Sequence, residues 1–212
     1  EYKVMRRRVV DIAGSSGGKL TVTLNGEEIS VSGFEDYVNL CRQPPTESEA
    51  TTLPPMVYHK LNARWEVDVG LSETKSLESI SFVNGMNTSR GGTHVDVLAR
   101  QISQYIADHI NTKMAKQLDS PITVTPRMVR RHLLLCVNSL IENPSFDSQM
   151  KECLTSNPEN FGSHYELPNS FLRKLVKPAM ALDESDSSDN DEDSVADKEK
   201  AGPGIVEEVL RM

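Results

Sequence analysis

The run Leu133-Leu-Leu-Cys-Val137 and the segment Leu140-Ile-Glu-Asn-Pro-Ser-Phe-Asp-Ser-Gln-Met-Lys-Glu152 decide the fold of this chain. The leucine-rich run predicts a buried strand. Pro144 cannot continue strand pairing and favours an extended backbone at the asparagine before it, so we expect the strand to give way to a polar loop. The loop carries Gln149 and Lys151, and an amide with a lysine at the end of a core strand suits an anionic oxygen such as a terminal phosphate. An ordinary surface loop with a solvated lysine has the same pattern.

The segments around this strand predict a mixture of strands and helices. Residues 19–24 and 27–32 alternate around Asn25-Gly26, the strongest short signal for a β-hairpin. Residues 94–116 carry apolar side chains at spacings of three and four, which is typical of a long amphipathic helix. Further strands are expected at 64–71, with clean polar–apolar alternation, and at 77–84; shorter helices are expected at 1–13, 34–40 and 168–175. This order predicts an α+β or α/β sandwich in which helices cover one face of a mixed β-sheet.

Composition and cysteine content favour a globular protein of a reducing, intracellular compartment. Of the 212 residues, 37% are hydrophobic and 25% charged, enough for one good core. No apolar run could span a bilayer and no signal-peptide pattern opens the chain. Cys41, Cys136 and Cys153 are an odd number without CxxC spacing, which argues against a disulfide framework and a zinc site. The chain does not begin with methionine, so we expect a fragment of a longer protein.

The net charge of −8 comes from one acidic segment. Residues 183–199 hold nine acidic residues and one lysine, a sum of −8, so the other 195 residues balance to zero. Like charges at this density cannot form a core, and residues 180–203 are therefore predicted to be a disordered insertion, open to a basic partner such as a histone. Apolar periodicity resumes after it, and residues 204–212 predict the first turns of a helix.

Two other segments carry candidate anion-binding groups. Ser89-Arg-Gly-Gly-Thr-His94 joins a predicted strand to the long helix; its glycines and the helix N-terminus can bind an anion, and a tight turn with room for packing has the same pattern. Near the end of that helix, Asn111, Thr112, Lys113 and Lys116 can contact a DNA backbone, as can the arginines at 127, 130 and 131. A solvated helix end, or the solvent face of a strand leading towards residue 133, explains these basic residues equally well.

No motif of a self-contained active site is present. The chain has no P-loop, no GxSxG, no HExxH and no specially spaced carboxylates, and its five histidines are scattered. His94 stands near Asp96, which is more typical of a structural hydrogen bond than of a catalytic dyad. We expect no metal site and no chemistry performed by this chain alone.

Several sequence blocks together closely resemble the eukaryotic type IIA DNA topoisomerases. The blocks are Met5-Arg-Arg-Arg8, Asp11-Ile-Ala-Gly14, Leu24-Asn-Gly26, Arg64-Trp-Glu-Val67, Ile80-Ser-Phe-Val-Asn84, Ser89-Arg-Gly-Gly-Thr-His-Val-Asp96, the run from Val137 to Glu152, and Phe161-Gly-Ser163. They follow the family order across nearly the whole chain. The resemblance implies that residues 1–13 end a GHKL-type ATPase domain and that residues 14–179 are the transducer domain, similar in fold to the second domain of a small-subunit ribosomal protein. It also implies that residues 204–212 begin the C-terminal transducer helix, whereas the insertion at 180–203 has no family counterpart.

The resemblance further implies a nucleotide-sensing role. The family's transducer places a Gln-Thr-Lys loop in the neighbouring ATP site, and the matching residues here are Gln149, Met150 and Lys151, with Met in place of Thr. Lys151 would neutralise charge on the γ-phosphate of ATP, while Mg²⁺ would be bound mainly outside this chain. The family's lysine-rich DNA-contacting loop corresponds to about residues 111–116.

The whole enzyme would then be an ATP-hydrolysing DNA topoisomerase, which acts as a homodimer on double-stranded DNA. It would be nuclear, with an organellar form left open. The alternative is a nucleic-acid-binding or scaffolding module of the same fold without a nucleotide role. A related GHKL protein, such as a mismatch-repair factor or chaperone, is disfavoured by the Ile-Glu-Asn-Pro block.

Overall fold

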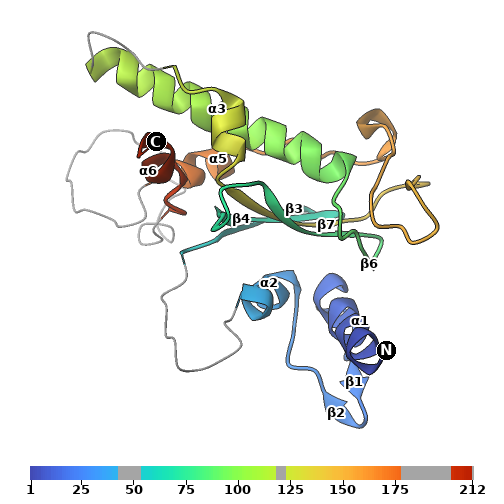
Figure 1. The fold of residues 1–212 in the computed structure, drawn as a ribbon. Helices are drawn as coiled ribbons and strands as arrows, with labels where there is room; N and C mark the ends of the chain where they lie inside the picture. The colour runs from blue at the N-terminus through green and yellow to red at the C-terminus, as the bar shows by residue number, and fades with distance from the viewer. Residues whose placement is uncertain (43–53, 118–122, 178–201, 212) are drawn as a thin grey trace.

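The computed structural model describes residues 1–42, 54–117, 123–177 and 202–211, and its centre is a five-stranded mixed sheet (Figure 1). The strands lie in the order β3 (Val57–Asn62), β4 (Trp65–Leu71), β7 (Leu133–Ser139), β5 (Glu78–Val83) and β6 (Met86–Asn87). β7 is antiparallel to β4 and parallel to β5. The leucine-rich run therefore forms the central strand, and the predicted mixed α+β architecture is confirmed.

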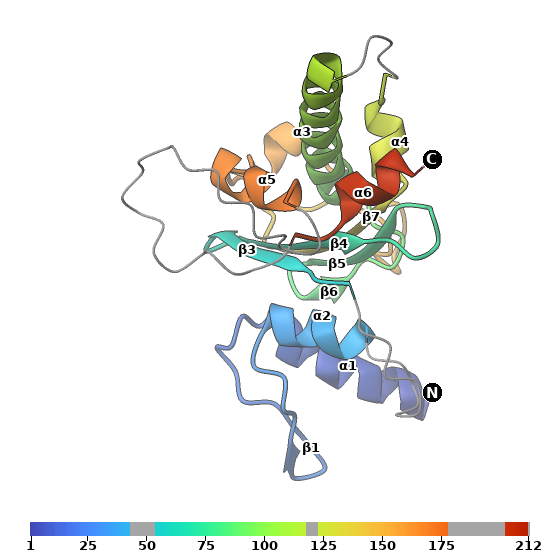
Figure 2. The same cartoon turned by 90° about the vertical axis from the view of Figure 1, so that its left-hand side faces the viewer.

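One face of the sheet carries the larger core. α3 (Thr93–Gln117) crosses this face, accompanied by α4 (Pro126–Arg130), α5 (Asn169–Leu175) and α6 (Ile205–Leu210) (Figures 1 and 2). Leu98, Ile102 and Ile106 of α3 are fully buried in one apolar cluster with Val67 of β4 and Leu135 of β7. Each such side chain contributes about 1.5–3 kcal/mol by leaving water, so the predicted apolar stripe holds α3 on the sheet.

The opposite face is covered as well, by α1 (Tyr2–Ser15) and α2 (Phe34–Arg42), with the short hairpin of β1 (Thr23–Leu24) and β2 (Glu27–Glu28) beyond them (Figure 2). Phe34, Tyr37 and Val38 of α2 pack with Phe82 of β5 and Cys136 of β7. The expectation that helices cover one face is therefore wrong. Because both faces are covered, β4 is buried along its length except at its last residue, and its alternating polar residues do not reach solvent.

The strands β3 and β6 form where no strand was expected, and three expected features also differ in the structure. The hairpin at Asn25-Gly26 is confirmed, but its two strands have two residues each and stand apart from the main sheet. The segment expected to lead into β7 as an extended chain begins with helix α4, because Pro126 suits a first helical turn. Asn143 has a φ of 44° instead of an extended backbone, since asparagine tolerates the left-handed region.

Of the predicted insertion at residues 180–203, the structure describes only the last two residues. Residues 180–201 lie outside the described residues, and so do residues 118–122 after α3. Gly202 and Pro203 are described and buried, so the prediction of disorder is wrong for these two. A side chain on Gly202 would collide with the backbone of Lys177, so the chain returns close to the point where it leaves α5. The helix predicted from residue 204 is confirmed as α6.

Candidate functional site

Residues 145–155 form a small hairpin-like loop beyond the end of β7. Phe146 and Leu154 form an antiparallel bridge, and the amide of Thr155 donates to the carbonyl oxygen of Ser145 at 2.8 Å. These backbone contacts join the outgoing arm to the returning arm. The loop is therefore a paired structure with a defined tip, not an open coil.

Gln149, Met150 and Lys151 lie at this tip and are exposed, Met150 to 74%. Lys151 has a φ of 59°, and its amide closes the turn by donating to the carbonyl oxygen of Ser148 at 3.1 Å. Its ammonium nitrogen lies 5.9 Å from the ring centre of Phe146. Among the described residues, no carboxylate lies within ion-pairing distance of this ammonium group. The tip therefore presents a positive charge that can accept an anion.

The returning arm is bonded to the turn that begins α3. The amide of Leu154 donates to the carbonyl oxygen of Gly91 at 3.1 Å, and the amide of Thr93 donates to the carbonyl oxygen of Leu154 at 3.0 Å. A Cβ atom on Gly92 would lie 2.4 Å from that carbonyl oxygen. Only glycine allows this close approach, so the pair of glycines fixes the loop against α3.

Three amides of the same turn, those of Arg90, Gly91 and Thr93, are already occupied. The amide of Arg90 donates to the carbonyl oxygen of Glu152, and that of Gly91 to Thr88, both at 2.9 Å. The Arg90 guanidinium pairs with Asp147 at 2.7 Å. The geometry therefore supports the tight turn over the anion site for residues 89–94. The two segments singled out separately in the sequence form one unit.

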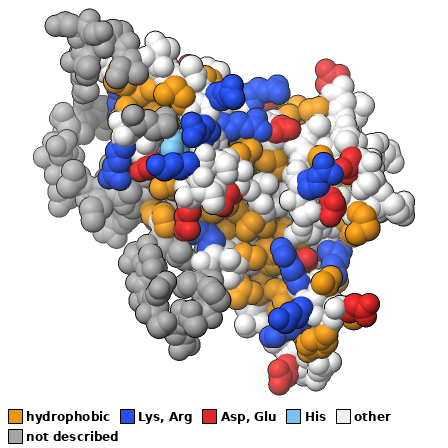
Figure 3. Space-filling model, in the orientation of Figure 1, with side chains coloured by type: hydrophobic (Ala, Val, Ile, Leu, Met, Phe, Trp, Pro, Cys, Tyr) orange, Lys and Arg blue, Asp and Glu red, His pale blue; other side chains and the backbone are white. Residues whose placement is uncertain are grey.

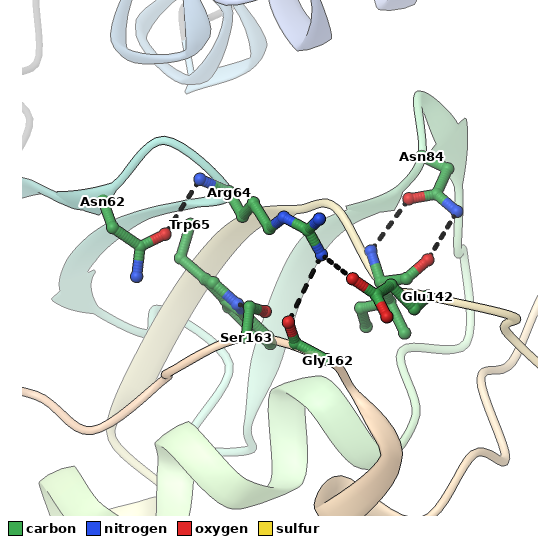
Figure 4. A network of polar contacts seen from close by, with 8 residues as sticks. Asn62, Arg64, Trp65, Asn84, Glu142, Gly162 and Ser163 are labelled. Carbon is green, nitrogen blue, oxygen red and sulfur yellow. Dashed lines mark hydrogen bonds and ion pairs between the residues drawn. The ribbon is translucent and has the colours of Figure 1, made fainter.

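The outgoing arm begins in a polar network at the end of β7 (Figure 4). The Asn84 side chain donates to the carbonyl oxygen of Ile141 and accepts from its amide, both at 2.9 Å. Arg64 Nη1 lies 2.8 Å from Glu142 Oε1 and donates to the carbonyl oxygen of Gly162 at 3.4 Å. Residues from four separate sequence blocks thus meet where the loop leaves the sheet.

No pattern in the sequence assigns a role to this network. Its one visible signal is the dipeptide Asn84-Gly85, which repeats the Asn-Gly pattern of residues 25 and 26. That pattern predicts a turn, but the bond to a backbone 57 residues further along the chain has no sequence signature.

The four candidate DNA-contacting residues lie inside the last turns of α3 instead of in a loop after it. The Asn111 side chain accepts from the amide of Val124 at 2.8 Å and donates to its carbonyl oxygen at 2.9 Å. The Thr112 hydroxyl donates to a backbone carbonyl one turn earlier at 2.7 Å. Lys113 is exposed, and the side chain of Lys116 lies outside the described residues. Asn111 thus holds the segment before α4, while Lys113 faces solvent.

Basic side chains also gather over the helical part of the face drawn in Figure 3. On α4 and just after it, Arg127 and Arg131 are exposed, whereas Arg130 forms an ion pair with Asp96 of α3. These arginines belong to a helix end and not to the solvent face of a strand.

His94 is a structural residue. It is fully buried, its Nε2 lies 3.3 Å from the Thr88 hydroxyl, and burial lowers its pKa to about 4, so the ring is neutral at pH 7. Asp96 pairs with Arg130 instead. Within the described ranges, no three His, Cys, Asp or Glu residues are placed to hold a metal ion. No helix in those ranges is both long and apolar enough to cross a membrane.

Comparisons with known proteins agree with this arrangement. Residues 33–178 match the family model described as DNA gyrase B. DNA topoisomerase 2 of Arabidopsis thaliana is 39% identical over 209 residues, which are 97% of this chain and 14% of that protein. The mitochondrial DNA topoisomerase 2 of Dictyostelium discoideum is 37% identical over 187 residues, 85% of this chain and 14% of that protein. The chain thus spans about a seventh of the length of these relatives.

Solved structures give the same result. The ATPase and transducer domains of DNA topoisomerase II from Balamuthia mandrillaris superpose with a TM-score of 0.70 at 40% identity, over 82% of this chain and 40% of that one. The ATPase region of Saccharomyces cerevisiae topoisomerase II superposes with a TM-score of 0.67 at 36% identity, over 81% and 40%. This chain therefore belongs to the DNA gyrase B family and is a relative of the eukaryotic type II DNA topoisomerases.

Proposed function

We propose that this chain is the transducer region of an ATP-dependent type II DNA topoisomerase and couples ATP hydrolysis to the passage of one DNA duplex through another. Residues 1–13 end the GHKL ATPase domain, 14–179 form the transducer, 180–203 are an insertion and 204–212 begin the C-terminal transducer helix. Family membership supports the activity, and a relative whose solved part comprises ATPase and transducer domains supports the placement.

The observation that carries the proposal is the position of Lys151. Its ammonium group is exposed at the tip of a paired loop, and no described carboxylate pairs with it. In the ATP site of the ATPase domain it neutralises negative charge on the γ-phosphate, and the Gln149 amide donates a hydrogen bond to the same group. Met150 offers no hydroxyl, but it leaves both of these contacts available.

The attachment of the loop to the start of α3 explains how loss of the γ-phosphate is transmitted away from the ATP site. Loss of the γ-phosphate removes the partner of Lys151 and Gln149. Because Leu154 is bonded on both sides to the turn before α3, a displacement of the loop moves the start of that helix. The far end of α3 carries Lys113, our candidate DNA contact together with Asn111, Thr112 and Lys116.

The part of the chain that the structure describes offers no site for Mg²⁺. The described residues contain no cluster of carboxylates placed to hold it, so no step here depends on the ion. We assign Mg²⁺, ATP binding itself and base catalysis to domains outside this chain.

Three further assignments follow from the same proposal. The full-length enzyme acts as a homodimer on double-stranded DNA. It is nuclear, although one relative is named as mitochondrial. The acidic insertion binds a basic partner, because the net charge of −8 on its residues 183–199 attracts cationic surfaces.

The test is Lys151→Ala in the full-length enzyme, measured as DNA-stimulated ATP turnover and DNA relaxation. We expect turnover to fall by about tenfold or more, the range for loss of one phosphate-contacting charge. Lys75→Ala is the matched control, because Lys75 is also an exposed lysine with a left-handed backbone, at a φ of 55°. Unchanged ATPase activity in the Lys151 variant would overturn the proposal and favour a scaffolding or nucleic-acid-binding module.

A further inference from the structure

The Asn84-Gly85 turn joins three parts of the molecule that are distant in sequence. Asn84 and Gly85 have φ values of 52° and 73°, the left-handed pair of a two-residue hairpin turn between β5 and β6. Such a turn needs a residue that tolerates a positive φ, and glycine or aspartate would satisfy it as well as asparagine. The backbone alone therefore does not explain the asparagine.

The Asn84 side chain explains it, because it replaces a missing strand partner. The side-chain amide donates to the backbone carbonyl oxygen of Ile141, the second residue after β7, and accepts from the backbone amide of Ile141. The backbone amide of Asn84 donates to the carbonyl oxygen of Ser139 at 2.9 Å. A primary amide is the uncharged side chain that offers a donor and an acceptor in this geometry. Ile141 is 4% exposed, so its backbone groups lack ready access to water if these bonds are lost.

The turn is held from the other side by α1. Arg8 Nη1 donates to the carbonyl oxygen of Gly85 at 2.7 Å. The Ser15 hydroxyl oxygen would lie 3.6 Å from a Cβ on Gly85, so the C-terminal part of α1 passes close to the turn. The turn thus links the α1 layer on one side with the first residues of the loop on the other.

The direction in which the loop leaves the sheet is set at this point. Ile141 is held by Asn84, and the next residue, Glu142, is held by Arg64 and by the backbone of Phe161 at 3.2 Å. The outgoing arm of the loop runs five residue steps from Ser145 to Met150, and an extended chain of that length reaches about 16 Å. A rotation of the arm by about 5° at its base therefore displaces the tip by more than about 1 Å. A misplacement of this size can lower a rate by about a hundredfold.

We propose that Asn84 is a positioning residue for Lys151: it fixes the base of the loop against a turn that α1 holds in place. The proposal rests on the role of Lys151 in ATP turnover given above. Asn84 touches no substrate, and it acts through the loop.

The test compares Asn84→Gly with Asn25→Gly in the full-length enzyme. Both changes keep the left-handed backbone of an Asn-Gly turn, and Asn25 has a φ of 54° but no side-chain hydrogen bond to a described residue. We expect Asn84→Gly to lower kcat for ATP hydrolysis by about tenfold with a smaller change in KM, and Asn25→Gly to leave both unchanged. Asn84→Asp keeps the acceptor for the Ile141 amide and should restore part of kcat.

Two further measurements separate positioning from general damage. In a Lys151→Ala background, Asn84→Gly should cause no additional loss of kcat, because the group that it positions is absent. Hydrogen exchange of the amides of residues 147 and 155 should quicken in the Asn84 variant and not in the Asn25 variant. If Lys151→Ala lowers turnover while Asn84→Gly leaves kcat unchanged, or lowers it equally in both backgrounds, the positioning role is overturned and the role of Lys151 stands. If Lys151→Ala has no effect, the proposed function itself fails.

Discussion

The two faces of the central sheet are buried to a similar degree but are built from different chemistry. The face under α3 is packed with a large cluster of aliphatic and aromatic side chains. Its buried polar side chains are neutral, as in the contacts among Ser81, Thr88 and His94. Three carboxylates are buried in the described ranges, and all three lie on the α1 and α2 side: Asp11 in α1, and Glu66 and Asp68 in β4.

This difference predicts which layer separates first. Burying a carboxylate costs free energy unless hydrogen bonds or ion pairs compensate for it, and neither carboxylate oxygen of Asp68 has a partner among the described residues. No carboxylate is among the buried residues of the cluster under α3. We therefore expect the α1 and α2 layer to open from the sheet at a lower free energy than α3, a property that suits a junction between two moving parts.

The largest expected effect on the free energy of unfolding comes from truncating a side chain of the apolar cluster under α3. Ile102→Ala should lower the free energy of unfolding by about 4 kcal/mol, because it removes a fully buried side chain from the centre of the α3 cluster. Val38→Ala in α2 should cost about half as much, because it removes a smaller side chain from a smaller cluster. Urea unfolding measures both losses, and hydrogen exchange should show α2 losing protection before α3. Equal losses, or earlier exchange in α3, would break the comparison.

The same contrast explains what the sequence could reveal. The strand β7 was predictable from its continuous apolar run, and the helix α3 from apolar residues that recur with the helical period. Glu66 and Asp68 alternate with valines in β4 as solvent-facing residues would, since periodicity cannot detect a second layer of helices.

The candidate site likewise has residues that the sequence revealed and contacts that it did not. Lys151 and Gln149 were found from their place after a core strand and from the family resemblance, and their ATP contact stays a prediction. The hydrogen bonds of Asn84 depend on a meeting of segments 57 residues apart, which only the fold brings together.

The second expected effect is a pH dependence confined to the α2 face. Burial, and then the nearby Glu35 carboxylate, raise the pKa of Asp68 to about 7, while Arg42 acts in the opposite direction. Because this pKa lies above that of the unfolded chain, the folded protein keeps a proton that the unfolded chain has lost. Stability should therefore fall by about 3 kcal/mol as pH rises from 5 to 8 and change little above that range.

Asp68→Asn tests this dependence, because the neutral amide mimics the protonated acid. Thermal unfolding at both pH values should show the variant gaining stability over the natural chain at pH 8 and little at pH 5. Asp36→Asn is the control, since hydrogen bonds from Ser32 lower the pKa of that exposed carboxyl group, and its loss should change stability by the same amount at both pH values. A parallel pH profile for the natural chain and the Asp68 variant would mean that Asp68 is ionised in the folded state.

The smallest expected effect comes from Asp11, a buried carboxylate whose hydrogen-bonding partner lies on α2. The Tyr37 hydroxyl of α2 donates to Asp11 Oδ1 of α1 at 2.7 Å, and both residues are buried. Tyr37→Phe should lower the free energy of unfolding by about 1.5 kcal/mol, because it leaves the Asp11 carboxylate without this donor. In the Tyr37→Phe background, Asp11→Asn should recover part of the loss, because the neutral amide is cheaper to bury alone. If Tyr37→Phe were neutral, the α1 and α2 layer would admit water to Asp11, and the two faces would differ in hydration more than in packing.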